Sequence, residues 1–151
     1  MIEIVNYTEA TKEYVKTLNY EWLEKYFVVE QNDVMQLADP QKEIIDKGGL
    51  IYYAKHNGKI VGTVSLLKVD NNVYELGKMA VTDGTQGLGI GKLMIEHCFK
   101  IARQSGIAKL ILYSNTQLKP AIHLYEKYGF TEIPLEPGHY ARANIKMEKL
   151  M

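Results

Sequence analysis

Cysteine is almost absent from this sequence: the 151 residues contain one, Cys98. A single cysteine excludes an intramolecular disulfide framework and fits a reducing compartment, so we expect a cytoplasmic protein. Because Cys98 falls in the apolar stripe of a predicted helix, we expect it to be an inert core residue.

Long apolar runs are also missing. No stretch approaches the roughly 20 consecutive apolar residues that a membrane-spanning helix requires. The N-terminal segment MIEIVNYTEA carries an acidic residue early and has no apolar run, which is not the pattern of a signal peptide. The sequence therefore predicts no association with a membrane.

An excess of either charge is missing as well. The chain has 18 Lys and Arg against 18 Asp and Glu, a formal net charge of zero. No overall field would attract nucleic acid, so we expect no nucleic-acid partner, although a local basic site is still allowed. The length and a hydrophobic content of 46% fit one domain spanning residues 1–151.

Hydrophobic periodicity divides the first part of the chain into a strand and two helices. Residues 2–7 alternate apolar and polar side chains, which indicates a strand, and residues 8–27 change to helical spacing. The segment 38–49 predicts a short second helix, with Asp39 as its N-cap and Gly48 just past its end.

The middle of the chain predicts an antiparallel meander. Three runs rich in β-formers occupy residues 50–56, 59–69 and 73–81. The first two are joined by Asn57-Gly58, the strongest short signal for a β-hairpin.

The last part of the chain returns to alternating helices and strands. An apolar stripe at helical spacing begins at Ile90 and is ended by Gly106, and a buried strand follows at 108–114. This strand–helix–strand order suggests a right-handed crossover and a parallel strand pair. A helix at 120–130 follows, with Pro120 at its start and Gly129 in the C′ position. Strands at 130–135 and 143–150 complete an α/β (α+β) domain with a mixed, largely antiparallel sheet.

Glycine is concentrated where the helix after the meander begins. Gly84, Gly87, Gly89 and Gly91 fall within eight positions, although glycine is costly in regular structure. A strand, a glycine-rich turn and a helix start form an anion site, because the first N–H groups of a helix lack intrahelical partners. Lys92 opposes the helix dipole, which is easier to explain if an anion lies nearby.

Three phosphate-binding patterns can be compared with this turn. A P-loop fails, because Gln86 stands where its first glycine belongs and Leu93 where its hydroxyl belongs. A Rossmann turn fails, because the third glycine of G-x-G-x-x-G is missing in either register. The pattern Gln/Arg-x-x-Gly-x-Gly/Ala is matched in full by Gln86, Gly89 and Gly91.

This third pattern resembles the pyrophosphate loop of the GNAT superfamily of N-acetyltransferases. The segment ELGKMAV at 75–81 resembles the central strand of that family, and residues 111–130 resemble its second cofactor segment. The order of elements matches over nearly the whole chain. One departure is Gln86, where many members have arginine, which removes a charge near the phosphates.

The resemblance implies a fold and a co-substrate. The parallel strands at 73–81 and 109–114 should splay apart, with helices on both faces of the sheet, and acetyl-CoA should lie in the opening. The main chain of the first strand should hold the pantetheine arm and meet the thioester oxygen. The implied cofactor-binding residues are Met79, Ala80, Val81, Gln86, Gly87, Leu88, Gly89, Ile90, Gly91, Lys92 and Asn115.

The resemblance also implies direct attack of a primary amine on the thioester. Tyr125 matches the family's acid, which donates a proton to the departing CoA thiolate. Glu75 is the candidate base, acting directly or through water. Each residue has a structural alternative, because Tyr125 falls on a packed helix face and a strand glutamate often faces solvent. The rival function is a non-catalytic acyl-CoA-binding sensor of the same fold.

The acceptor stays open between a small-molecule amine and an amine of a peptide or protein. Aromatic and acidic residues in the expected acceptor region suit a cationic amine; they are Trp22, Tyr26, Glu30 and Tyr140. Arg142 would instead favour an acceptor that carries a carboxylate. The four histidines are scattered and predict no metal site. Family members are often dimers, so a homodimer is an expectation from the resemblance.

Overall fold

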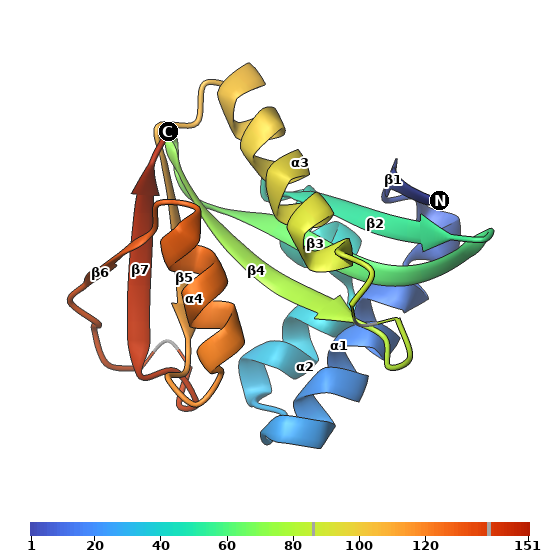
Figure 1. Ribbon diagram of the computed structural model, residues 1–151, viewed down its shortest axis with the longest axis horizontal. Coiled ribbons are helices and arrows are strands. Elements are labelled where there is room, and N and C mark those ends of the chain that lie inside the picture. The colour runs from blue at the N-terminus through green and yellow to red at the C-terminus, as the bar shows by residue number, and fades with distance from the viewer. Residues whose placement is uncertain (86, 139) are drawn as a thin grey trace.

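The computed structural model of the protein describes residues 1–85, 87–138 and 140–151. Within these residues the strands form one seven-stranded sheet with the order β1-β2-β3-β4-β5-β7-β6 (Figure 1). The strands are β1 (Ile2–Asn6), β2 (Leu50–His56), β3 (Lys59–Asp70), β4 (Val73–Val81), β5 (Lys109–Ser114), β6 (Thr131–Ile133) and β7 (Ile145–Leu150). The α-helices are α1 (Glu13–Tyr26), α2 (Gln31–Ala38), α3 (Ile90–Gln104) and α4 (Lys119–Lys127).

The strands β2 to β4 form the predicted antiparallel meander, and β1 adds an antiparallel strand beside β2. Asn57 and Gly58 have φ values of 52° and 79°, as a tight hairpin turn between twisted strands requires. The crossover through α3 then places β5 parallel to β4, and β7 and β6 add antiparallel strands beyond β5. The predicted mixed, mostly antiparallel sheet is confirmed.

The two parallel strands pair over a short distance only. Their register runs from Val73 opposite Lys109 to Glu75 opposite Ile111. Beyond these positions β4 continues to Val81 and β5 to Ser114, with no further pairing between these described residues. Backbone groups of the two strands that would have paired are therefore available along the opening.

A β-bulge accompanies the opening. Thr63 pairs with Ala80 and Ser65 pairs with Gly77, so two residues of β4 stand opposite one of β3. One of the two is Lys78, whose φ of 49° lies in the left-handed region, where a residue with a Cβ is strained. Bulges bend a strand and re-aim its side chains, and this one lies where β4 leaves β5.

Helices cover both faces of the sheet, as predicted. On β2, Tyr53 packs in a core cluster with Val15 of α1 and Leu37 of α2, whereas the next residue, Ala54, packs in a cluster with Met94 of α3. This alternation places α1 and α2 on one face and α3 on the other (Figure 1). Side chains of α4 also pack against the α3 cluster.

The helices differ from the prediction at the N-terminal end. Helix α2 was not predicted, and the helix predicted at 38–49 is reduced to a helical turn, Gln41–Ile45. Helix α2 begins with a capping box in which the N–H of Glu30 donates to Asp33 Oδ2 at 2.9 Å. No helix among the described residues is long and apolar enough to cross a membrane.

Helix α4 ends at Lys127, and Gly129 occupies the predicted C′ position with a φ of 94°. The N–H of Phe130 donates to the carbonyl of Tyr125 at 3.0 Å, and the N–H of Gly129 donates to that of Glu126 at 3.0 Å. These two bonds form a Schellman motif. The motif fixes the end of the helix that carries Tyr125.

Candidate active site

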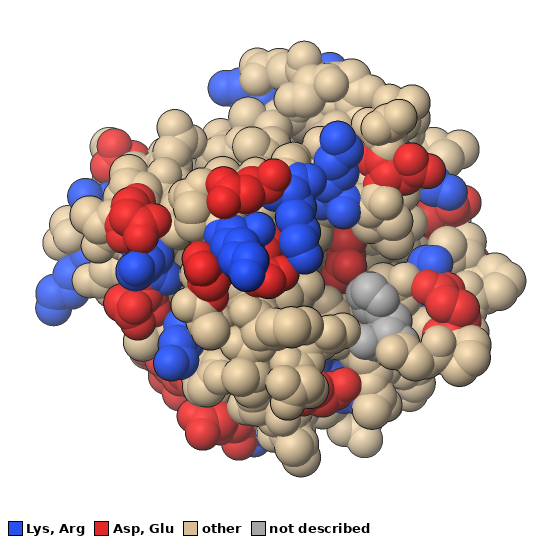
Figure 2. Space-filling view, turned by 180° about the vertical axis from the view of Figure 1, so that it is seen from behind, with Lys and Arg blue, Asp and Glu red and all other residues tan. Residues whose placement is uncertain are grey.

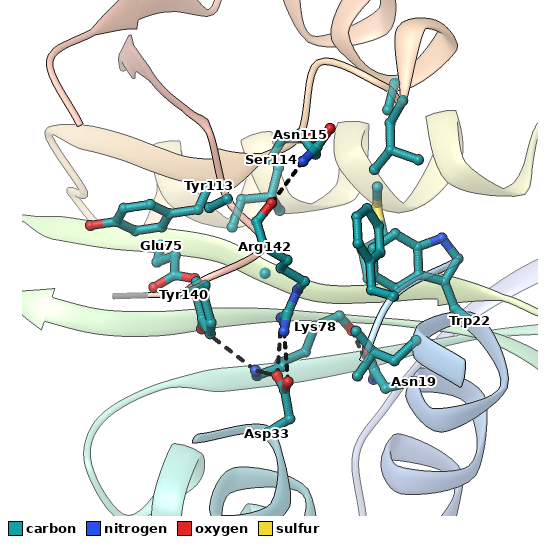
Figure 3. A pocket seen from close by; sticks show the side chains of 18 of the residues that line it. Asn19, Trp22, Asp33, Glu75, Lys78, Tyr113, Ser114, Asn115, Tyr140 and Arg142 are labelled. Carbon is teal, nitrogen blue, oxygen red and sulfur yellow. Dashed lines mark hydrogen bonds and ion pairs between the residues drawn. The ribbon is translucent and has the colours of Figure 1, made fainter. Parts of the chain in front are cut away.

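A cavity of about 200 Å³ lies where β4 and β5 separate, and side chains from α1, α2, α4 and the segment before β7 complete its wall (Figure 3). Five consecutive residues of β4, Glu75 to Met79, line it. Strict alternation along a strand would have placed only every second residue there. This alternation breaks down at the bulge formed by Lys78 and Met79.

Six of the predicted site residues line this one cavity: Trp22, Glu75, Met79, Asn115, Tyr125 and Tyr140. Two predicted substrate residues lie elsewhere. Tyr26 is 53% exposed and does not line the cavity. Glu30 does not line it either, but it pairs with Arg142, which does. The structure therefore brings the candidate acid and base together at the opening of the sheet.

The hydroxyl of Tyr125 is available for a hydrogen bond to a ligand. The ring lies edge-on to Phe130, with centroids 5.9 Å apart. The hydroxyl has no hydrogen-bond partner among the described residues. Burial raises the pKa of Tyr125 to about 12, so the phenol is protonated at neutral pH and can donate to a ligand atom.

Glu75 is a buried carboxylate, 5% exposed. The hydroxyl of Tyr140 donates to its Oε2 at 3.3 Å. Burial, followed by the charge of Glu75, raises the pKa of Tyr140, so this hydroxyl is protonated at neutral pH and can donate. Tyr113, edge-on to Tyr140 with centroids 5.8 Å apart, also lines the cavity.

Asp33 is the centre of an ion-pair network in the cavity wall (Figure 3). Its Oδ1 lies 3.0 Å from Lys78 Nζ, and the guanidinium of Arg142 donates to both of its carboxylate oxygens, at 2.6 and 3.0 Å. Burial alone would raise the pKa of Asp33, but the hydrogen bonds from Arg142 and the charge of Lys78 lower it. Burial lowers the pKa of Lys78 although Asp33 opposes this.

Glu30 ties the start of α2 to the segment before β7. Its carboxylate accepts hydrogen bonds from the backbone N–H groups of Ala141 at 2.8 Å and Arg142 at 3.1 Å, and from the Arg142 guanidinium at 3.2 Å. Asn115 holds the same segment from the other side, because its Nδ2 donates to the Arg142 carbonyl at 2.8 Å. Asn115 Oδ1 accepts from the N–H of Gln117 at 2.8 Å, so this side chain is engaged in its own loop.

Asn19 of α1 is a site residue that sequence reasoning missed. It is 3% exposed, and its Nδ2 donates to the carbonyls of Val15 at 2.8 Å and Lys78 at 3.2 Å. The second bond fixes the bulge of β4 against α1. A lone asparagine within an amphipathic helix carries no sequence signal for such a role.

The glycine turn has the shape of an anion cradle. Gly84, Gly87 and Gly89 have φ values of 88°, 87° and 76°, and Gly89 is the N-cap of α3. Gly91 lies inside the helix, yet a Cβ there, as at the other three, would meet no described atom within 4 Å. Neither packing nor backbone conformation therefore requires glycine at position 91. A ligand that lies against the backbone would require it, because a side chain would occupy the ligand's space.

The other predicted cofactor-binding residues differ in how exposed their side chains are. Leu88 and Lys92 are exposed, whereas Ile90 and Ala80 are 2% and 3% exposed and have core side chains. Only the main chain of Ile90 and Ala80 can face a ligand. Gln86 lies outside the described residues. The donor set that remains, helix-start N–H groups beside open space, fits a diphosphate such as that of CoA.

Charges on the face in Figure 2 are interspersed, with Lys and Arg beside Asp and Glu. Among the described residues, no group of three or more His, Cys, Asp or Glu side chains is arranged to hold a metal ion. Among the described residues, the charged groups of the site are those of the network around Asp33 and the carboxylate of Glu75.

The model of the Acetyltransferase (GNAT) family matches residues 15–130. The chain therefore belongs to the GNAT acetyltransferase family, as the resemblance predicted. N-acetyltransferase family 8 member 2 of Rattus norvegicus is 28% identical over 109 residues, which cover 69% of this chain and 46% of that protein. The uncharacterized N-acetyltransferase YvbK of Bacillus subtilis is 29% identical over 101 residues, 65% of each chain. The chain spans about half the length of the rat relative.

Solved structures share the fold over the full chain. A GNAT-family acetyltransferase from Staphylococcus aureus Mu50 superposes with a TM-score of 0.88 at 24% identity, covering 99% of both chains. The PaiA N-acetyltransferase of Thermoplasma acidophilum, in complex with coenzyme A, has a TM-score of 0.76 at 20% identity, covering 100% of this chain and 99% of that one. At these identities the similarity establishes the fold.

Proposed function

We propose that this chain is an N-acetyltransferase that moves the acetyl group of acetyl-CoA to a primary amine by direct attack. Family membership supports acyl transfer as the reaction class. The observation that carries the proposal is the cavity at the opening of the sheet, because Glu75 and Tyr125 line it together.

Acetyl-CoA supplies a thioester whose carbonyl carbon accepts the amine. The N–H groups of Gly87 to Lys92 hold its pyrophosphate, and Gln86, the first residue of the matched sequence pattern, is assigned to the same ligand. The main chain of Met79 and Val81 pairs with the pantetheine arm as an added strand would. The N–H of Ala80 or Val81 donates to the thioester oxygen, where one fixed donor is worth roughly 3 kcal/mol.

Glu75 removes the protons that the amine must lose, directly or through water. An ammonium has no lone pair, so one proton leaves before attack and a second leaves as the nitrogen–carbon bond forms. The carbon–sulfur bond breaks, and the sulfur takes up one proton. Each ammonium acetylated thus releases one proton to solvent.

Tyr125 donates to the departing sulfur. A phenol with a pKa of about 12 is a weaker acid than a thiol, whose pKa is about 8.5. The hydroxyl therefore stabilises the thiolate as a hydrogen-bond donor during bond breaking, and solvent supplies the final proton. The half-buried Trp22 and the buried Tyr140 supply aromatic surface for the acceptor. A cytoplasmic location and a homodimer remain predictions.

Two assays test this function. In a thermal-shift assay, acetyl-CoA and CoA should raise the melting temperature while NAD and ATP should not. In a thiol-release assay with a panel of amines, Tyr125→Phe should lower kcat with little change in acetyl-CoA affinity, and Glu75→Gln should lower kcat as well. Stabilisation by NAD or ATP alone would overturn the proposal.

Tyr128→Phe is the matched control on the same helix. The Tyr128 hydroxyl donates to Glu96 at 2.9 Å, and the residue does not line the cavity. The Tyr128→Phe variant should leave kcat unchanged. The rival function, a CoA-binding sensor, predicts stabilisation by CoA compounds with no thiol release from any amine.

A further inference from the structure

We infer that the acceptor is a small amine that carries no carboxylate group. This inference rests on the proposed function and names the substrate class of the same cavity. It follows from the charges of the wall, from its aromatic surface and from the size of the space.

The cations of the wall are already neutralised. Among the described residues that line the cavity, the cationic side chains are Lys78 and Arg142. Both bind Asp33, at 3.0 and 2.6 Å, and Arg142 also binds Glu30 at 3.2 Å. A substrate carboxylate would have to displace a buried carboxylate of the protein to reach either cation.

The described cations of the wall do not outnumber the carboxylates that they bind. Lys78 and Arg142 are paired with Asp33 and Glu30, so each positive charge of this group is matched by a negative one. A substrate carboxylate buried beside them would meet no uncompensated cation among the described residues, which is costly. An ammonium would instead meet the carboxylate of Glu75, which lines the same cavity, and an uncharged amine would carry no such cost.

The aromatic surface points to the same class. The Trp22 ring lies in the wall, 5.5 Å from the Phe27 ring between centroids, and Tyr113 lies on the opposite side of the cavity beside Glu75 (Figure 3). The face of an aromatic ring attracts a cationic amine electrostatically, whereas it does not attract a carboxylate.

The space limits the size of the acceptor. About 200 Å³ is less than the roughly 300–1,000 Å³ of pockets that bury drug-sized ligands. Part of it must take the acetyl end of the co-substrate, because Tyr125 and Met79 line the same space. The bonds from Glu30 to Ala141 and Arg142 close the wall between α2 and the segment before β7.

Matched pairs of acceptors test the inference with acetyl-CoA and the full chain. Tyramine is compared with tyrosine, histamine with histidine, and agmatine with arginine. The pair that contains the fastest acceptor is used for the comparison. In that pair, kcat/KM should be at least about 100-fold higher for the amine than for the amino acid, which carries the carboxylate. Tyrosine methyl ester keeps the branch at the α-carbon but removes the charge, so it should behave like tyramine.

A variant tests the cause of the selectivity. Glu30→Gln removes one carboxylate from Arg142 and should raise kcat/KM for tyrosine relative to tyramine about tenfold. Glu24→Gln, at an exposed position of α1, should leave the ratio unchanged.

The results separate a wrong inference about the acceptor from a wrong proposed function. Equal or faster acetylation of the amino acids, or of an amidated pentapeptide through its N-terminus, overturns this inference and leaves acetyl transfer in place. Absence of thiol release from every amine overturns the proposed function together with the inference.

Discussion

The ammonium of Lys78 lies 3.0 Å from Oδ1 of Asp33, and their side chains are 4% and 0% exposed. This pair connects the bulge of β4 to α2, so the strand that opens the sheet and the helix that walls the cavity are held by one buried contact. The left-handed backbone at Lys78, with φ of 49°, is retained because this pair and the Asn19 hydrogen bond both hold it.

Asp33→Asn should destabilise the protein strongly. The change leaves Lys78 and Arg142 buried without their shared counter-ion, at a cost of about 3–5 kcal/mol in the free energy of unfolding. Lys78→Met should cost less, because Asp33 keeps Arg142. Urea denaturation at pH 7 measures both, with Asp46→Asn at an exposed position as the control. A loss below about 1 kcal/mol for Asp33→Asn would contradict the assigned network.

Gly91→Ala should stabilise the ligand-free protein and weaken CoA binding. Its backbone is helical, and a Cβ would enter open space, so alanine gains about 0.5–1 kcal/mol of helix stability. The same methyl group occupies the space assigned to the pyrophosphate. Calorimetric titration should show at least about tenfold weaker CoA binding.

Gly58→Ala provides the opposite control. Gly58 has a φ of 79° in the hairpin between β2 and β3, so alanine there should cost about 1 kcal/mol and leave CoA affinity unchanged. Unaltered CoA affinity in Gly91→Ala would remove the reason assigned to that glycine.

The unfolding free energy should fall on acidification because of His97. Its ring lies edge-on to Tyr52 with centroids 4.5 Å apart, and its buried Nε2 has no hydrogen-bond partner among the described residues. Burial, followed by the charge of Lys100, lowers the pKa of His97. Near its ordinary pKa of about 6.5 the unfolded chain therefore binds more protons than the folded one. This stability is present above that pKa and is lost as pH falls through the lower, folded value.

Urea denaturation at pH 7.5, 6.5 and 5.5 measures this slope. His97→Leu should flatten it, whereas His123→Gln, at an exposed position of α4, should leave it intact. An identical slope in His97→Leu would show that other groups cause the dependence.

Most strands and the later helices were predictable because their signals are local. The Asn57-Gly58 turn, the Pro120 start and the Gly129 end of α4 each impose a backbone conformation on nearby residues alone. Helix α2 was missed because its cap is made by two acidic residues, Glu30 and Asp33, and Glu30 was assigned to the acceptor site. Both are in fact partners of Arg142.

The network of the site was less accessible to sequence reasoning. Lys78 in a β-rich run reads as one polar position of an alternating strand, and its burial depends on a bulge that no local signal marks. Strict alternation would place Glu75, Gly77 and Met79 on one side of β4, and the bulge between Gly77 and Ala80 breaks that pattern. Arg142, expected to favour an acceptor with a carboxylate, is paired because α2, absent from the prediction, brings Asp33 to it.

The proposed function depends most on the N–H groups at the start of α3, to which we assign the pyrophosphate of CoA. Titration of ¹⁵N-labelled protein with CoA, followed by ¹H–¹⁵N NMR, observes these groups one by one. The amide signals of Gly87, Gly89 and Gly91 should move with CoA while those of Gly58 and Gly106 stay in place. If the three loop signals stay unmoved at saturating CoA, the assignment of the pyrophosphate to these groups is wrong.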